Sequence, residues 1–316
     1  MVAEIMSKAA IVFPGQASQY VGMGKDLYEY DPDVRKLYDL ASDQIGDDIA
    51  RLSFEGPAET LKETRFTQPA ILLHSLAVLI IMKDSLPEVR MTAGHSLGEY
   101  GSLAMAGVLS FEDAIRAVVR RASLMEEACR RNRGTMAAIM GLEEEKIAEI
   151  CRTASEKGIV VPANFNSSNQ IVISGSLVGV EEACRLCREQ GAKRAMILQV
   201  GGAFHSPLME PAQTEMQKYL DTVTFAEPSI AIVPNVTGTA TDDAAHLKEL
   251  LVEQLTAPVK WHQTMKYFAE QGIDTLIEVG PGKVLSGLAK RELDNARIFN
   301  IDTLTDIRNF SGTMVG

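Results

Sequence analysis

Cysteine is scarce in this chain of 316 residues. Its four cysteines, Cys129, Cys151, Cys184 and Cys187, are too few for a disulfide scaffold at this length, so we expect a reducing compartment, the cytoplasm. Cys184 and Cys187 have the spacing of half a zinc site, but no second CxxC or HxxxH pair accompanies them. The sequence therefore predicts that these two cysteines pack inside a helix and that the protein binds no metal.

Long hydrophobic runs are also missing. The longest apolar stretch covers residues 70–82 and is interrupted by His74 and Ser75, whereas a membrane-spanning helix needs about 20 apolar residues. Residues 1–10 carry charges and no apolar core of the signal-peptide kind. We therefore expect a buried core helix at residues 70–82, no signal peptide and no membrane association.

Positive charge is in deficit. The chain has 31 lysines and arginines against 42 aspartates and glutamates, which gives a formal net charge of -11. A field of this sign disfavours nucleic acid as a partner, and an acidic protein partner would need a local basic patch. Heptad repeats are absent, so we expect a monomer. The 46% of hydrophobic and 23% of charged residues are ordinary for a globular protein.

Short apolar runs alternate with amphipathic segments over much of the chain. The runs that predict strands are residues 9–13, 89–93, 230–235 and 275–279. The segments that predict helices are residues 69–83, 111–130, 210–220, 245–255 and 263–271. This alternation indicates an α/β domain with a mostly parallel sheet.

Residues 133–200 follow a different order of elements. Here the patterns predict strand, helix, strand, strand, helix and strand in succession, which is the βαββαβ order of a ferredoxin-like fold. We therefore divide the chain into a large α/β domain, residues 1–132 and 201–316, and a small inserted subdomain, residues 133–200.

The strongest chemical signal is Gly94-His95-Ser96-Leu97-Gly98, a G-x-S-x-G motif between a predicted strand and a predicted helix. Small residues permit the sharp turn that lifts the serine hydroxyl clear of the sheet. The backbone N–H groups of the following helix start then favour a developing negative charge. The motif predicts a nucleophilic Ser96; the alternative is a glycine-bracketed helix start with an incidental serine.

A serine nucleophile needs a base, and the chain offers five histidines. His95 adjoins Ser96 but points elsewhere at a sharp turn, and His74 is expected in the core. His246 and His262 lie in polar surroundings typical of solvated helix ends. His205 lies in a loop directly after the insert, where a rigid scaffold can position a base, so it is our leading candidate.

An arginine gives the third signal. On a helix over residues 111–130, Arg116 and Arg120 face away from the apolar side, but Arg121 falls at its border, beside Met125. An arginine there can reach into a cleft and bind a carboxylate with two parallel hydrogen bonds. It can equally be a snorkelling arginine with a buried stem and an exposed charge. The sequence alone leaves both interpretations open.

Four blocks of sequence, in order, resemble the acyltransferase family of fatty acid and polyketide synthesis, which includes the malonyl-CoA:acyl carrier protein transacylases. The blocks are residues 13–19 (FPGQASQ), 94–100 (GHSLGEY), 203–206 (AFHS) and 278–285 (EVGPGKVL). The resemblance extends from residue 11 to about residue 291. It implies a hydrolase-like α/β domain with a ferredoxin-like insert, in agreement with the predicted elements.

The resemblance also implies an activity. It predicts transfer of a malonyl group from malonyl-CoA to the phosphopantetheine thiol of acyl carrier protein through a malonyl-serine, in fatty acid biosynthesis and without a cofactor. Ser96 would be the nucleophile and His205 its base. The backbone N–H groups of Gln16 and Leu97 would form the oxyanion hole. The backbone carbonyl of Gln254 would orient His205, so no aspartate is needed.

The same resemblance assigns residues to the acyl group. Arg121 matches the arginine that pairs with the malonyl carboxylate, and an acetyl group would leave this charge buried and unpaired. Asn166, Gln170 and Met125 are expected to line the pocket. Phe204, together with Leu97, resembles malonyl-selecting members of the family.

The chain departs from the family at one position of the first block. Ala17 stands where the family usually has glycine, and a methyl group there would alter the loop beside the oxyanion hole and its acyl-group selectivity. For the carrier protein, the resemblance points to four basic residues as a docking patch: Lys193, Arg194, Lys290 and Arg291.

Three other functions fit parts of the pattern. A trans-acting acyltransferase of a polyketide synthase would carry the same motifs. A serine esterase or thioesterase would place an acidic residue between the serine and the histidine along the chain, and none stands out there. A non-catalytic docking protein would have no need of an activated serine.

Overall fold

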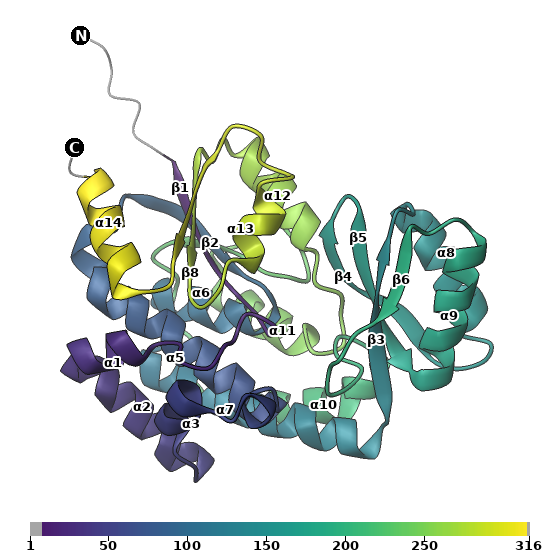
Figure 1. Ribbon diagram of the computed structural model, residues 1–316, viewed down its shortest axis with the longest axis horizontal. Helices are drawn as coiled ribbons and strands as arrows, with labels where there is room; N and C mark the ends of the chain where they lie inside the picture. The colour runs from purple at the N-terminus through teal and green to yellow at the C-terminus, as the bar shows by residue number, and fades with distance from the viewer. Residues whose placement is uncertain (1–7, 315–316) are drawn as a thin grey trace.

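A five-stranded parallel sheet is the framework of the larger part of the molecule (Figure 1). The computed structural model describes residues 8–314; the segment before residue 8, where we expect no signal peptide, lies outside the described residues. The strands, in chain order, are β1 (Ala9–Phe13), β2 (Val89–Gly94), β7 (Ala231–Val233), β8 (Thr275–Val279) and β9 (Arg297–Ile301). Their order across the sheet is β7-β2-β1-β8-β9, and each neighbouring pair is parallel.

Helices cover both faces of this sheet. They are α1 (Lys25–Tyr30), α2 (Pro32–Ile45), α3 (Ile49–Glu55), α4 (Ala58–Leu61), α5 (Thr64–Met82), α6 (Glu99–Met105), α7 (Phe111–Arg131), α10 (Glu210–Leu220), α11 (Ala244–Glu253), α12 (Trp261–Glu270), α13 (Val284–Ala289) and α14 (Leu304–Met314). Three short 3₁₀ helices are η1 (Lys83–Ser85), η2 (Ser96–Gly98) and η3 (Pro207–Met209).

The central strand β1 shows why both faces are covered. All five of its residues are buried, and successive side chains point to opposite faces. Ile11 and Phe13 pack into the core that contains α5, α6 and α7. Ala10 and Val12 pack into a second core with α12 and α13. The continuous apolar run therefore marks a strand between two helical layers.

The register of β1 and β2 determines where the loops after them lie. Ile11 pairs with Thr92 and Phe13 with Gly94, so the two strands end side by side. Beyond Phe13 the chain enters the segment that contains Gln16, and beyond Gly94 it reaches Ser96. Two sequence blocks that are 80 residues apart are thereby brought to the same edge of the sheet, the carboxyl edge where α/β proteins bind ligands.

The core helix α5 begins earlier than the sequence predicts. The apolar pattern predicts a helix from residue 69, but the helix begins at Thr64 and Pro69 lies inside it. The first turn is secured from outside the helix, since the hydroxyl of Thr67 donates to the carbonyl of Leu61 and the N–H of Arg65 donates to Glu126. Among the described residues, 64–85 are long and apolar enough to cross a bilayer, but 83% of the most apolar window is buried in the molecule, as expected for a core helix.

The second sheet is antiparallel and lies beside the first (Figure 1). Its strands are β3 (Gly134–Met140), β4 (Val160–Ser167), β5 (Gln170–Ser176) and β6 (Arg194–Ile197), in the order β4-β5-β3-β6. The helices α8 (Glu144–Ala154) and α9 (Leu177–Glu189) pack on its outer face. This is the predicted βαββαβ succession, and Cys184 and Cys187 are buried in its core.

Backbone hydrogen bonds join the two parts. Phe165 in β4 donates to the carbonyl of Val259 at 2.9 Å, and Val259 donates to the carbonyl of Ala163 at 2.8 Å. This contact fixes the edge of the small sheet against the segment that follows α11. The domain boundaries at residues 133 and 200 stay our proposal; the strands of the two sheets fall on either side of them.

We predict that Gly94→Ala severely destabilises the fold. A Cβ at this position would lie 1.9 Å from the carbonyl carbon of Gly98, so strand and elbow would have to separate. We expect the free energy of unfolding to fall by about 3 kcal/mol or more, measured by urea denaturation. The control is Gly287→Ala in α13, where nothing lies within 4 Å and helix propensity predicts a gain of up to about 1 kcal/mol. Equal effects of the two changes would contradict this account.

Candidate active site

Ser96 lies directly after β2 and begins the 3₁₀ turn η2. Its backbone has a φ of +51°, a left-handed conformation that is unusual for a residue other than glycine. Its Oγ lies 2.8 Å from Nε2 of His205. The structure thus brings together the predicted nucleophile and its predicted base from positions 109 residues apart.

His205 is buried and held from its other side. Its Nδ1 lies 2.8 Å from the backbone carbonyl of Gln254. A carbonyl only accepts hydrogen bonds, so Nδ1 carries the hydrogen and Nε2 presents a lone pair to the hydroxyl of Ser96. Burial, and then the positive charge of Arg121, lower the pKa of His205 to about 3. The imidazole is therefore neutral at physiological pH and able to take a proton.

Arg121 is fully buried, which excludes the snorkelling interpretation. Its Nη1 donates to Oε1 of Gln68 at 2.7 Å. Its Nη2 donates to Oε1 of Gln254 at 3.0 Å and to Oγ of Ser96 at 3.1 Å. Burial lowers the pKa of Arg121, while Tyr100 and Glu99 oppose that shift. The guanidinium is thus solvated by neutral oxygens beside the reacting hydroxyl, and none of these direct acceptors is a carboxylate.

The segment after β1 packs against the elbow. The N–H of His95 donates to the carbonyl of Phe13 at 3.0 Å, and a Cβ on Gly15 would lie 2.7 Å from the carbonyl oxygen of His95. Oε1 of Gln16 accepts from Nε2 of Gln68 at 3.1 Å. Leu97 is the second residue of η2, where N–H groups have no acceptor within the helix. This packing places the predicted oxyanion residues, Gln16 and Leu97, on neighbouring segments.

Ala17 has a φ of +80°, so it occupies a conformation that glycine adopts more readily. Its side chain is exposed, and its N–H donates to Oε1 of Gln19 at 2.8 Å. The effect of alanine in place of glycine at position 17 is therefore strain in the backbone of this loop, not a steric contact of the methyl group. Among the described residues, the non-glycine residues with positive φ are Ala17, Ser96 and His205, all in this region.

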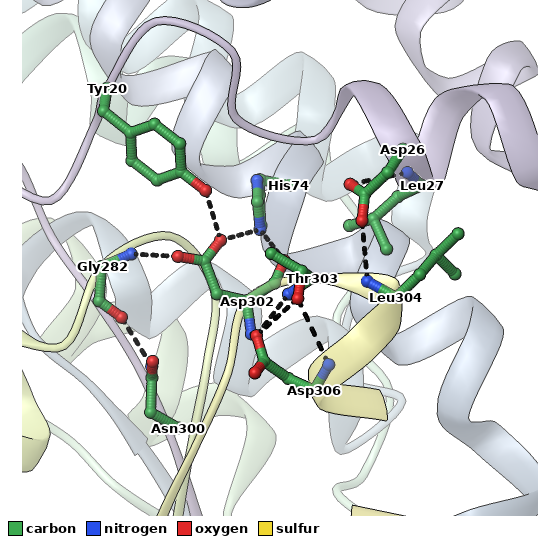
Figure 2. A network of polar contacts seen from close by, with 10 residues as sticks. All are labelled: Tyr20, Asp26, Leu27, His74, Gly282, Asn300, Asp302, Thr303, Leu304 and Asp306. Atoms are coloured by element: carbon green, nitrogen blue, oxygen red, sulfur yellow. Dashed lines mark hydrogen bonds and ion pairs between the residues drawn. The ribbon is translucent and has the colours of Figure 1, made fainter. Parts of the chain in front are cut away.

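The far end of the same segment is anchored by Asp302. Its Oδ1 accepts from the hydroxyl of Tyr20 at 2.8 Å and lies 3.0 Å from Nε2 of His74, while its Oδ2 accepts from the N–H of Gly282 at 3.0 Å (Figure 2). Burial alone would raise the pKa of Asp302, but His74 and the other partners lower it below its ordinary value. A charged carboxylate thus ties the segment that carries Gln16 to the C-terminal part of the chain.

The predicted pocket residues occupy two places. Met125 and Phe204 are buried, and Sδ of Met125 lies 3.4 Å from Nε2 of Gln68, beside the arginine. Asn166 accepts from Nε2 of His95 at 2.9 Å, and its own amide donates to Gln170 at 3.4 Å. The hydrogen bonds of Asn166 and Gln170 therefore reach the elbow through His95, and the role of these two residues toward the acyl group stays a prediction.

The other histidines mostly lie as expected. His74 is buried in α5, and His95 points toward Asn166. The side chain of His246 is 47% exposed at the start of α11. The expectation of a solvated position is wrong for His262, whose side chain is only 16% exposed because it lies against Glu292.

The basic residues predicted to dock a carrier are exposed. Lys193 and Arg194 lie at the start of the edge strand β6, and Lys290 and Arg291 lie just after α13.

Within residues 8–314, no group of three or more histidine, cysteine, aspartate or glutamate side chains has the geometry of a metal site.

A comparison with protein families decides the class of this site. The family model described as acyl transferase domain matches residues 10–307. The chain belongs to the acyl transferase family. It is 45% identical to the malonyl CoA-acyl carrier protein transacylase of Bacillus subtilis over 287 residues, and this aligned region covers 90% of each chain.

Solved structures agree with this assignment. An acyl carrier protein S-malonyltransferase from Vibrio cholerae superposes with a TM-score of 0.91 at 42% identity, covering 96% of this chain and 99% of the other. A malonyl-transacylase in complex with a type II polyketide synthase acyl carrier protein superposes with a TM-score of 0.92 at 39% identity, covering 97% of this chain and 100% of the other.

Sequence analysis missed three polar residues of this acyl transferase site. Gln68 joins Gln16 to Arg121 but lies in an apolar helix with no motif to mark it. Glu99 was inside the GHSLGEY block, and Asn235 ends a predicted strand. Both Glu99 and Asn235 are buried. Asn235 accepts from the N–H of Ser96, and Glu99 accepts from the side chain of Gln254. A polar residue at the carboxyl end of a parallel strand was the available signal for Asn235.

We predict that Ala17→Gly stabilises the protein. The change relieves a left-handed alanine, so the free energy of unfolding should rise by about 1 kcal/mol in denaturant titrations. Ala245→Gly, an exposed helical position in α11, is the matched control and should lower it by up to about 1 kcal/mol. A loss of stability in Ala17→Gly would show that the strain is not relieved by glycine.

We also predict that Arg121→Ala changes the pH dependence of Ser96. The positive charge lowers the pKa of His205, so its removal should raise that pKa and move the acid limb of reactivity to higher pH. The rate of labelling by a small fluorophosphonate, followed from pH 4 to 8, measures this limb. Arg120→Ala, one residue away and exposed, should leave it unchanged. An unmoved limb in Arg121→Ala would refute the electrostatic coupling.

Proposed function

We propose that this acyl transferase moves the malonyl group of malonyl-CoA to the phosphopantetheine thiol of acyl carrier protein, in the cytoplasm and in fatty acid biosynthesis. The observation that carries the proposal is the buried guanidinium of Arg121, which lies 3.1 Å from the nucleophilic oxygen. A buried cation next to the reacting atom favours an acyl group that brings its own carboxylate. The relatives named above, malonyltransferases, support the same substrate.

The first half-reaction loads the enzyme. The hydroxyl of Ser96 gives its proton to Nε2 of His205 as its oxygen attacks the thioester carbonyl. The N–H groups of Gln16 and Leu97 would stabilise the oxyanion, and loss of one such donor typically costs about 10²–10³ in rate. The carbon–sulfur bond then breaks, and the CoA thiolate takes the proton from His205. The product is a malonyl ester of Ser96.

The second half-reaction reverses these roles. The carrier's phosphopantetheine thiol passes its proton to His205, and its sulfur attacks the ester. The bond to Oγ breaks, and Ser96 recovers the proton. Nucleophile, base and oxyanion donors are all protein groups, so the proposed reaction uses no metal or cofactor. The exposed residues Lys193, Arg194, Lys290 and Arg291 are proposed to attract the acidic carrier.

The matching malonyl-transacylase bound to a polyketide carrier supports a second candidate within the same chemistry. A polyketide carrier protein would be the acceptor instead of the fatty acid carrier. The two alternatives are separated by comparing kcat/KM for the two carriers with malonyl-CoA held constant.

We predict that the intact mass of the protein rises by one malonyl group on exposure to malonyl-CoA and returns to its start when a carrier is added. Ser96→Ala should show no adduct. Release of CoA with no mass transferred to the carrier would favour a thioesterase. An unmodified protein with intact malonyl-CoA would favour a docking protein.

Arg121→Ala tests the clamp in the same assay. Breaking a buried charge contact costs about 3–5 kcal/mol, so kcat/KM for malonyl-CoA should fall by about 100-fold or more while acetyl-CoA gains relative to it. Arg121→Lys keeps the charge but cannot form two parallel hydrogen bonds. Its kcat/KM for malonyl-CoA should lie between the values of the wild type and of Arg121→Ala. An unchanged preference for malonyl-CoA in Arg121→Ala would remove Arg121 from this role.

A further inference from the structure

Asn235 grips the nucleophile elbow from the neighbouring strand. It follows β7, which pairs with β2, and its side chain is fully buried. Its Oδ1 accepts from the backbone N–H of Ser96 at 2.7 Å, and its Nδ2 donates to the backbone carbonyl of Gly94 at 2.6 Å. One amide thus spans the turn and fixes the backbone on both sides of His95.

The elbow needs such a support. A left-handed φ at Ser96 is strained by on the order of 1–3 kcal/mol and persists only where the surroundings impose it. The hydrogen bond from Ser96 to Asn235 supplies that constraint. It also occupies the N–H of Ser96, which leaves the N–H of Leu97 as the elbow's donor toward an oxyanion.

Glu99 holds Asn235 in turn. Its carboxylate is 1% exposed, and Oε2 accepts from the backbone N–H of Asn235 at 2.9 Å and from Nε2 of Gln254 at 3.0 Å. Nε2 of Gln254 also donates to the backbone carbonyl of Ser96 at 3.0 Å. Burial raises the pKa of Glu99 to about 7, against the opposing effect of these hydrogen bonds. The buried carboxyl group of Glu99 is therefore held in place by Asn235 and Gln254.

Gln254 connects this cluster with the rest of the site. Its backbone carbonyl accepts from His205, and its Oε1 accepts from Arg121. Among the described residues, Glu99 forms no direct hydrogen bond with His205 or Arg121, but it accepts from the side-chain amide of Gln254 that contacts the arginine. The cluster of Glu99, Asn235 and Gln254 thus fixes the nucleophile, the base and the cation together.

We propose that Asn235 and Glu99 are positioning residues: Asn235 clamps the backbone of the nucleophile elbow, and Glu99 fixes Asn235 and Gln254. The inference rests on the proposed role of Ser96 as nucleophile. It assigns to Glu99 an orienting task that differs from that of a triad acid, because it acts on the elbow and on the histidine's carbonyl partner rather than on the imidazole.

The first experiment substitutes Asn235. In Asn235→Ala, the rate of Ser96 labelling by a fluorophosphonate and kcat for malonyl transfer should both fall at least about tenfold, because small misplacement of a nucleophile is costly. KM for malonyl-CoA should change less than about threefold, since Asn235 lies behind the elbow. Asn235→Asp, of the same size, keeps the acceptor for Ser96 but loses the donor to Gly94, and its labelling rate should lie between wild type and Asn235→Ala.

Glu99 is tested by conservative rescue. Glu99→Gln retains an oxygen that can accept from Asn235 and Gln254, whereas Glu99→Ala retains none. Labelling should be within about threefold of wild type in Glu99→Gln and fall at least about tenfold in Glu99→Ala. The control is Ser155→Ala, which loses part-buried hydrogen bonds to the carbonyls of Cys151 and Val160 in the small subdomain and should not change labelling.

The outcomes separate this inference from the proposed function. Fluorophosphonate labelling does not depend on malonyl-CoA or a carrier, so it reports on the elbow even if malonyl transfer is absent. Wild-type labelling in Asn235→Ala and Asn235→Asp would overturn the clamp. Equal losses in Glu99→Gln and Glu99→Ala would overturn the orienting role of Glu99. An equal loss in Ser155→Ala would show that the effect is general destabilisation.

Discussion

The buried charge of Arg121 is the constraint on which the rest of the site depends. Desolvation of a guanidinium is costly, and here amide oxygens of Gln68 and Gln254 and the ring of Tyr100, 5.8 Å away, offset part of that cost. In the part of the chain that the structure describes, no carboxylate accepts a hydrogen bond from Arg121. The two Nη atoms are therefore solvated by neutral oxygens, the buried Nε has no hydrogen-bond partner, and the charge is not neutralised. The same charge lowers the pKa of His205, so in the free enzyme the base is weak. In the proposed reaction, a substrate carboxylate paired with Arg121 would cancel part of that field and restore basicity to His205. Recognition of an anionic acyl group and activation of the nucleophile would in this way be coupled through one side chain.

The parallel sheet makes this arrangement possible because it aligns segments that are distant in the chain. The pairing of Phe13 with Gly94 places the loop of Gln16 against the elbow of Ser96, and β7 delivers Asn235 to the same edge. Between β2 and β7 the chain leaves for the small subdomain and returns with His205. The insertion thus lies between the nucleophile and its base in sequence, and the contact of β4 with Val259 holds the subdomain beside the site.

Sequence patterns predicted the parts of this structure that have a period or a motif. Strand β1, helix α7 and the six elements of the small subdomain follow from apolar periodicity. Helices α1–α4 were not predicted. The segments α1, α3 and α4 have only four to seven residues and show no clear period. The 14-residue α2 was missed although Asp31 and Pro32 form a helix-start signal. Strand β7 is shorter than expected because Pro234 has no N–H for the ladder. In the site, Ser96 and Arg121 carried local signals. Gln68 did not, because its importance arises only when α5 packs against α7.

Among residues 8–314, Nδ1 of His205 bonds to a backbone carbonyl rather than to an acidic side chain, and the buried carboxylate of the site lies elsewhere. The carbonyl of Gln254 orients His205. Unlike a carboxylate, a backbone carbonyl does not titrate, so this hydrogen bond is not lost by protonation of the acceptor. It also adds no full negative charge beside the imidazole. An aspartate there would pair with the imidazolium and also attract Arg121, which would compete with a substrate carboxylate. The buried acid is instead Glu99, separated from the guanidinium by the side-chain amide of Gln254. Placed behind this amide, Glu99 opposes the effect of burial on Arg121 without occupying the guanidinium donors that the proposed acyl group would use.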